Sequence, residues 1–160
     1  MGALVMYELA HRLARDTRAV PRFLIVSGCR PPNMWVGGLS PPVSKLPRDE
    51  LVDHLLGLGG LPAELKDQRA LLDRFLPAIR ADYAALEVFE PDLGRAPLDC
   101  PVVCFGGMDD RGASPDDLAN WATFTTGGFQ FHMFPGGHFF LKDDGEPAVV
   151  AKLSEVLTAR

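Results

Sequence analysis

Residues 101–110, PVVCFGGMDD, say most about how this chain folds. An apolar run from Pro101 to Phe105 is followed at once by two glycines and then by two acidic residues. An apolar run without polar alternation is typical of a strand that is buried on both faces of a parallel sheet. In such sheets, functional residues gather in the loops beyond the carboxyl ends of the strands. We therefore predict a buried strand here, with candidate site residues in the loop that follows it.

The segments on both sides of this strand alternate between helical and strand patterns. Further strands are predicted at 23–26 and 129–134, and amphipathic helices at 1–14, 115–121 and 146–158. Ser114 is the expected N-cap of the helix that begins at Pro115. Alternation of this kind implies a layered α/β fold with a parallel sheet. Because three strands are few for an open sheet, we expect its N-terminal strands to lie upstream of Met1.

A long helical stretch separates the first two predicted strands. Apolar residues recur at helical spacing from Asp49 to Phe89, and glycines and a proline interrupt the pattern between 57 and 62. Pro77 is expected either to kink the helix that contains it or to separate two helices. The stretch therefore predicts a helical insertion into the α/β fold.

The composition argues against several classes of protein. The 160 residues are 47% hydrophobic and 23% charged, as in ordinary globular domains, and the formal net charge is −5. This charge balance argues against nucleic-acid binding, which normally uses a basic face, and against binding to an anionic membrane surface. No apolar segment is long enough to cross a bilayer, and the first residues do not resemble a signal peptide. Three cysteines without paired spacing, Cys29, Cys100 and Cys104, favour free thiols in a reducing compartment, so we expect a cytoplasmic protein.

Two loops that follow predicted strands carry titratable side chains. The first holds Asp109 and Asp110, and the second, Pro135–Phe140, holds His138. An acid after one strand and a histidine after the next is the order of the catalytic triad of α/β-hydrolases, whose serine lies earlier in the chain. In that triad the histidine takes the proton of the nucleophile, and the acid fixes the tautomer of the histidine. Each residue alone is more often part of a solvated turn or of the core, and it is their order along the chain that favours a site.

None of the serines of the chain lies in a nucleophile elbow of the form G-x-S-x-G. Ser27 ends a predicted strand, and none of the other serines has a glycine both two residues before it and two residues after it. Met1-Gly2, followed directly by an amphipathic helix, fits the last two positions of the elbow, so a serine is expected one residue before Met1. Since no group of histidine, cysteine and acidic residues has the spacing of metal ligands, we expect neither a metal nor a diffusible cofactor.

Several segments resemble type II thioesterases of polyketide and nonribosomal peptide pathways. The first ten residues are similar to the stretch that follows Gly-His-Ser in that family. Further similarities lie at 23–30, at 97–101, at Phe105-Gly106-Gly107, at Trp121, at Thr125-Thr126-Gly127 and at Phe134-Pro135-Gly136-Gly137-His138-Phe139-Phe140. The resemblance covers nearly the whole chain, and the last motif is fairly specific to this family.

The resemblance implies an α/β-hydrolase fold, with a parallel sheet, flanking helices and a helical lid. Residues 1–160 would form one partial thioesterase domain whose N-terminal strands are missing. The segment at about 39–90, which includes Leu58-Gly59-Gly60, is similar to the lid of the family. We therefore expect the helical insertion to be that lid.

The resemblance also assigns roles to individual residues. His138 would be the general base. Asp110 would be the acid because it ends the G-x-x-D pattern of the family, but Arg111 replaces the proline that often follows, which leaves Asp109 as the alternative. The backbone N–H of Met1, as the residue after the nucleophile, would be an oxyanion donor.

The activity implied by the resemblance is thioester hydrolysis. The substrate would be an acyl group on the phosphopantetheine arm of an acyl or peptidyl carrier protein. Serine attack would give an acyl-enzyme, and His138 would then activate water to release the acid. Two other interpretations are an inactive remnant or binding module, and an α/β-hydrolase that cleaves oxygen esters. An upstream G-x-S in the same reading frame would argue against the remnant, and a comparison of thioester with oxygen-ester substrates would test the esterase.

Overall fold

The computed structural model of the protein describes residues 1–36, 38, 41–142 and 145–158. Within these residues the centre of the fold is a parallel sheet of three strands in the order β1-β2-β3. The strands are β1 (Leu24–Ser27), β2 (Val102–Gly107) and β3 (Phe129–Phe134). Ile25 of β1 pairs with Val103 of β2, and Val103 pairs with Gln130 of β3. The predicted α/β fold with a parallel sheet is therefore confirmed.

The burial of the strands follows their position in the sheet. All six residues of β2 are buried, because this strand has a partner on each side and helices on both faces. In β1 buried and half-buried residues alternate. Burial on both faces, which an apolar run predicts, is therefore complete in β2 and only partial in β1.

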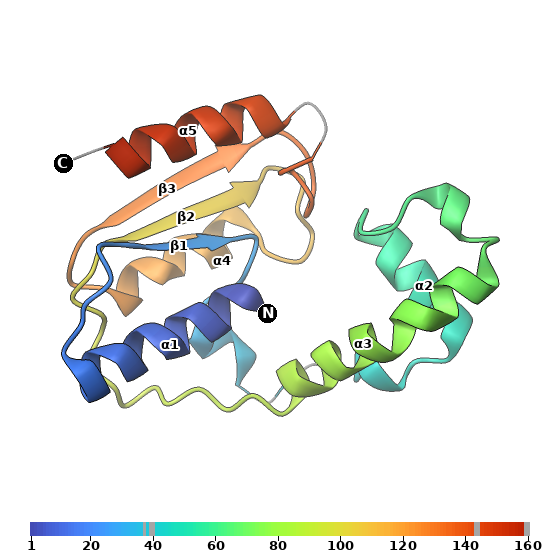
Figure 1. Ribbon diagram of the computed structural model, residues 1–160, viewed down its shortest axis with the longest axis horizontal. Helices are drawn as coiled ribbons and strands as arrows, with labels where there is room; N and C mark the ends of the chain where they lie inside the picture. Colours follow the sequence, from blue (N-terminus) through green and yellow to red (C-terminus); the bar gives the residue numbers. More distant parts are fainter. Residues whose placement is uncertain (37, 39–40, 143–144, 159–160) are drawn as a thin grey trace.

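Helices cover both faces of the sheet (Figure 1). On one face, α1 (Gly2–Thr17) and α4 (Pro115–Ala119) pack against β1 and β2 through an apolar core that includes Leu4, Val26 and Leu118. On the other face, α5 (Glu146–Thr158) packs against Val103 and Phe105. None of the helices in the described residues is long and apolar enough to span a membrane.

The predicted cap of α4 forms, but the helix is shorter than expected. The Ser114 hydroxyl accepts a hydrogen bond from the Asp117 N–H, and the Asp117 carboxylate accepts one from the Ser114 N–H. The α-helix ends at Ala119 and continues as a 3₁₀-helix, η4 (Asn120–Phe124). This tighter turn carries Trp121 into the core, where its indole N–H donates to the Cys29 carbonyl at 2.7 Å.

The helical insertion consists of short 3₁₀ turns and two α-helices. In chain order they are η2 (Val43–Lys45), α2 (Arg48–Gly57), η3 (Ala63–Leu65) and α3 (Arg69–Glu87), and η1 (Pro32–Trp35) precedes them. We call residues 43–87 the helical insertion. It has a core of its own, which includes Leu51 and Leu72, and it lies beside the carboxyl ends of the strands (Figure 1).

Two expectations about the insertion meet different outcomes. Pro77 lies inside α3, which continues through it and ends ten residues later at Glu87, so Pro77 does not separate two helices. Residues 39 and 40, where the lid was expected to begin, lie outside the described residues.

The three cysteines are free and buried, as predicted.

Candidate active site

The loops that follow β2 and β3 are bonded to each other at the carboxyl edge of the sheet. The Met108 N–H donates to the Phe134 carbonyl at 2.8 Å, and the Asp109 N–H donates to the Gly136 carbonyl at 2.9 Å. A side chain at Gly107 could not be accommodated, because its Cβ would lie 2.1 Å from the Gly137 carbonyl oxygen. Glycine at this position therefore lets the two loops meet.

Asp110 and His138 form a hydrogen-bonded pair at this edge. The His138 Nδ1 lies 2.8 Å from the Asp110 Oδ2. Asp110 is the only charged residue that is buried among those the structure describes, whereas the His138 side chain is 34% exposed. The other carboxylate oxygen accepts the Gly112 N–H at 2.7 Å. Because a buried carboxylate is costly unless it is hydrogen-bonded, these two donors hold its orientation.

This pairing defines what the imidazole can do. With Asp110 ionised, the Nδ1 of His138 is the protonated ring nitrogen and donates to the carboxylate. The Nε2 then has a free lone pair, which can accept a proton from a nucleophile. The exposed part of the His138 ring gives such a group access to the site. The arrangement is that of the acid and base of a hydrolase triad.

The two acidic candidates from the sequence have different positions. Asp110 lies against His138, whereas Asp109 is exposed on the outside of the same turn. Sequence reasoning did not identify Gly112, whose N–H closes the turn on the Asp110 carboxylate. The spacing Asp-x-Gly was a usable signal, because aspartate side chains commonly accept a hydrogen bond from the N–H two residues later.

The loop that follows β1 is the third side of the site. Gly28 has φ +55°, and a Cβ there would lie 3.5 Å from the His138 Cε1 and 3.7 Å from the Asp110 Oδ2. Burial raises the pKa of the neighbouring Cys29 thiol, while the nearby Met1 amino group acts in the opposite direction. Met1, the expected oxyanion donor, therefore lies near Cys29, the residue that follows Gly28. The predicted strand end Ser27-Gly28 was the sequence signal for this side.

Three serine hydroxyls in the described residues make hydrogen bonds that stabilise local structure. The Ser114 hydroxyl caps α4, the Ser44 hydroxyl donates to the Glu87 carboxylate, and the Ser154 hydroxyl donates to the Val150 carbonyl. Ser40 lies outside the described residues. Within the part of the chain that the structure describes, no histidine, cysteine and acidic side chains form a group that could hold a metal ion.

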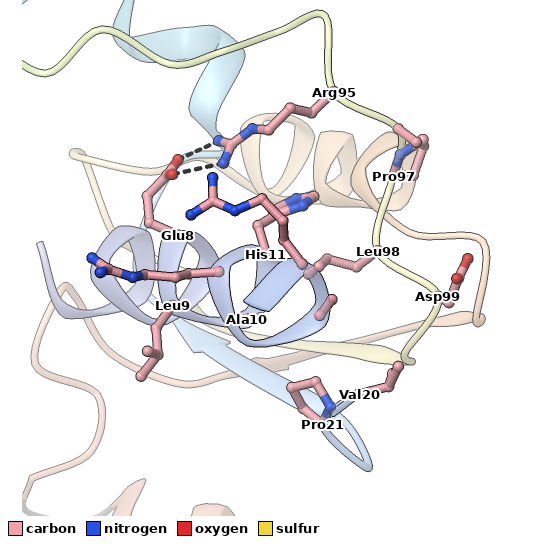
Figure 2. A pocket seen from close by; sticks show the side chains of 14 residues that line it. Glu8, Leu9, Ala10, His11, Val20, Pro21, Arg95, Pro97, Leu98 and Asp99 are labelled. Carbon is pink, nitrogen blue, oxygen red and sulfur yellow. Dashed lines mark hydrogen bonds and ion pairs between the residues drawn. The ribbon is translucent and has the colours of Figure 1, made fainter. Parts of the chain in front are cut away.

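A hollow with a volume of about 720 Å³ lies between α1 and the segment 95–99, away from Asp110 and His138. Figure 2 shows that the Arg95 guanidinium makes two hydrogen bonds to the Glu8 carboxylate there, at 2.8 and 2.5 Å. Burial lowers the pKa of His11 in this hollow, and the positive charge of Arg95 lowers it further. Neither Asp110 nor His138 lines it, so the hollow is separate from the candidate active site.

The sheet and the paired residues define the class of protein. A parallel sheet flanked by helices, with a buried acid after one strand hydrogen-bonded to a histidine after the next, is the arrangement of an α/β-hydrolase fold. The chain belongs to the thioesterase domain family, whose family model matches residues 1–157.

Individual relatives support this placement. The chain is 31% identical over 146 residues to the gramicidin S biosynthesis protein GrsT of Aneurinibacillus migulanus, covering 88% of this chain and 54% of GrsT. It is similar in structure to RedJ, a thioesterase from the prodiginine pathway of Streptomyces coelicolor, with a TM-score of 0.87 and 36% identity over 96% of this chain and 56% of RedJ. BorB, a type II thioesterase from the borrelidin cluster, has a TM-score of 0.81 and 31% identity over 96% of this chain and 60% of BorB. The chain thus spans about half the length of the curated relatives that it matches.

Proposed function

We propose that the chain is the acid- and histidine-bearing part of a type II thioesterase. Its substrates are acyl groups on the phosphopantetheine arm of acyl or peptidyl carrier proteins. The observation that carries the proposal is the hydrogen bond between the buried Asp110 and His138 at the carboxyl edge of the sheet. Membership of the thioesterase family supports it, as do the gramicidin S, prodiginine and borrelidin pathways in which the named relatives act.

The proposed reaction has two steps that share one base. A serine supplied from outside these 160 residues attacks the thioester carbonyl, and the His138 Nε2 takes its proton. The thiol of the phosphopantetheine arm leaves with that proton, and an acyl-serine ester results. His138 then takes a proton from water, which attacks the ester, and passes that proton to the leaving serine oxygen, so that the carboxylic acid and the free serine are released. Asp110 stabilises the imidazolium that forms in each step.

The backbone at Met1 has a proposed role in the same steps. Each attack places negative charge on the carbonyl oxygen, and a backbone N–H at that position stabilises the charge. The first turn of α1 begins here, with the Leu4 N–H donating to the Met1 carbonyl at 2.9 Å. We assign the N–H of Met1 to the oxyanion when a serine precedes it in the chain.

The helical insertion, residues 43–87, is the main part of the proposed lid, which would extend over about residues 39–90. Apolar side chains on α3 are exposed although they belong to a packed helix, with Phe75 56% and Leu71 37% exposed. Exposed apolar surface on a helical insertion suits a fatty acyl chain, and helical lids commonly gate sites of this kind. We therefore assign the acyl pocket and the contact with the carrier protein to this insertion.

The test uses a chimera in which the serine-bearing N-terminal part of the gramicidin S relative is joined to Met1. The chimera should release acyl groups from an acylated carrier protein, and faster than it cleaves an oxygen ester of the same acyl group. Faster cleavage of the oxygen ester would make the protein an esterase. Binding of the carrier without release of the acid, in a folded chimera, would favour a binding module.

A further inference from the structure

The two phenylalanines that follow His138 have different surroundings. Phe140 is 2% exposed and stacks on Phe134 in the core beneath α5, with ring centroids 5.6 Å apart. Phe139 is 37% exposed, and its ring lies nearly perpendicular to the His138 imidazole, at a centroid distance of 5.2 Å and an angle of 80°. Phe140 therefore anchors the loop in the core, while Phe139 contacts the candidate base itself.

Phe139 also contacts the helical insertion. A Cβ added at Gly60 would lie 2.9 Å from Cε2 and 3.0 Å from Cζ of the Phe139 ring. The backbone at Gly60 is not in the left-handed region, in contrast to Gly59 at φ +75°. A side chain at position 60 would therefore displace the Phe139 ring, and this constraint comes from the space that the ring occupies and not from the backbone conformation.

A positive charge on the loop also helps to hold the Phe139 ring in this position. The Lys142 ammonium lies 4.7 Å from the Phe139 ring centroid, on the loop that also holds His138. A cation over an aromatic face is attracted by the ring, so Lys142 restrains Phe139 from the loop side. The ring is therefore held between this lysine, the insertion at Gly60 and the imidazole.

We propose that Phe139 is a positioning residue through which the helical insertion holds the His138 imidazole against Asp110. The inference rests on the proposed function, in which His138 is the base. Asp110 fixes only one nitrogen of the imidazole, and the ring can still rotate about that hydrogen bond. The edge contact with Phe139 restricts the rotation, and Gly60 keeps Phe139 in place. When the insertion moves away from the loop, Phe139 loses its support and the imidazole loses its orientation.

The test is NMR spectroscopy of the 160-residue chain, which requires no turnover. The Phe139 ring current should displace the resonances of the Gly60 Hα protons and of the His138 ring protons, and Phe139→Leu should abolish both displacements. Phe139→Tyr, which keeps the ring, should preserve them. The Asp110-bonded Nδ1 proton of His138 should exchange with water roughly fivefold faster in Phe139→Leu, as expected for loss of one aromatic pair.

Gly60→Ala examines the link to the insertion, and Gly57→Ala is its matched control. A Cβ at Gly57 would have no heavy atom within 4 Å, so the same chemical change there leaves Phe139 undisturbed. Gly60→Ala should shift the His138 ring resonances and speed exchange of its Nδ1 proton, whereas Gly57→Ala should do neither. The double variant Gly60→Ala/Phe139→Leu should behave as Phe139→Leu alone, because the clash is gone.

The inference is overturned if Gly60→Ala and Gly57→Ala leave the His138 resonances equally unchanged, or if Phe139→Leu does not alter exchange of the Nδ1 proton. Phe140→Leu separates positioning from simple packing, since it should lower stability without changing the Gly60 resonances. These signals do not depend on hydrolysis. A chimera that fails to release acyl groups would therefore contradict the proposed function while leaving the contact between Phe139 and His138 testable.

Discussion

At the scale of single residues, two adjacent carboxylates have opposite environments. The Asp110 side chain is fully buried and accepts from His138 and from Gly112, whereas Asp109 is exposed and only its backbone contacts the second loop. Adjacent residues in a tight turn direct their side chains differently, and the sequence does not reveal which one faces the neighbouring loop. The loop motifs predicted that an acid and a histidine would meet here, and the G-x-x-D pattern favoured Asp110 as the acid but kept Asp109 as an alternative.

The difference between the two acids predicts different effects on turnover. In the chimera, Asp110→Asn should reduce turnover by about 10⁴-fold, because the amide no longer holds the required tautomer of His138. Asp109→Asn should change it by less than about threefold, as for most exposed positions away from the reaction. Single-turnover release of the acyl group measures both. If Asp109→Asn is the crippling change, the acid has been misassigned.

Gly107 is predicted to be intolerant of any side chain. Gly107→Ala places a Cβ against the Gly137 carbonyl, so the two loops must separate, at a cost of about 1–3 kcal/mol in the free energy of unfolding. Urea denaturation of the 160-residue chain measures this cost. Gly57→Ala is the control, because a Cβ there has open space. Equal midpoints for the two variants would show that the loops do not meet as described.

At the scale of elements, periodicity predicted best where an element is regular and local. The strand at 129–134 and the helix at 146–158 have the predicted bounds. The helix predicted at 115–121 was too long by two residues, because burial of Trp121 and its hydrogen bond to the Cys29 carbonyl favour a 3₁₀ turn. That contact joins segments far apart in the chain, and periodicity alone cannot reveal it.

The capping box of α4 predicts a measurable loss of stability. Ser114→Ala removes the acceptor for the Asp117 N–H and should lower the free energy of unfolding by about 1 kcal/mol. Ser154→Ala is a suitable control, because the exposed Ser154 hydroxyl lies within α5 and donates to the Val150 carbonyl. Chemical denaturation distinguishes the two. A larger loss from Ser154→Ala would contradict the importance of the cap.

His132 on β3 predicts a dependence of stability on pH. Burial lowers the pKa of His132 below its usual value of 6.5, and the Lys152 ammonium lowers it further, against the opposing effect of Glu155. Below pH 6.5 the unfolded chain therefore binds more protons at this residue than the folded chain, and stability falls as the pH falls towards the folded pKa.

The melting temperature of the chain and of His132→Phe should be measured from about pH 7 to about pH 5. This range spans the usual pKa of histidine, about 6.5. The variant should lose less stability on acidification, with a residual loss from His11, whose pKa burial also lowers. Parallel curves for the two proteins would show that His132 does not contribute.

At the scale of the whole molecule, the alternation of helices and strands predicted the layers but not their contact with the insertion. Helices on two faces of a parallel sheet follow from local patterns and from general rules of connection. The meeting of Gly60 with Phe139 does not, because it depends on how the insertion lies over the carboxyl edge of the sheet. In Figure 1, α2 and α3 occupy that side of the molecule. The candidate base therefore lies where the sheet, the loops and the insertion meet.

The role of His138 is tested by the rate at which the chimera with His138→Ala releases acyl groups from an acylated carrier protein. We expect a loss of at least about 10³-fold relative to the unaltered chimera, because no other group in the loop accepts the proton of the nucleophile. Circular dichroism should show that the variant is folded. Release at an undiminished rate by a folded His138→Ala protein would contradict the assignment of this pair as the catalytic acid and base.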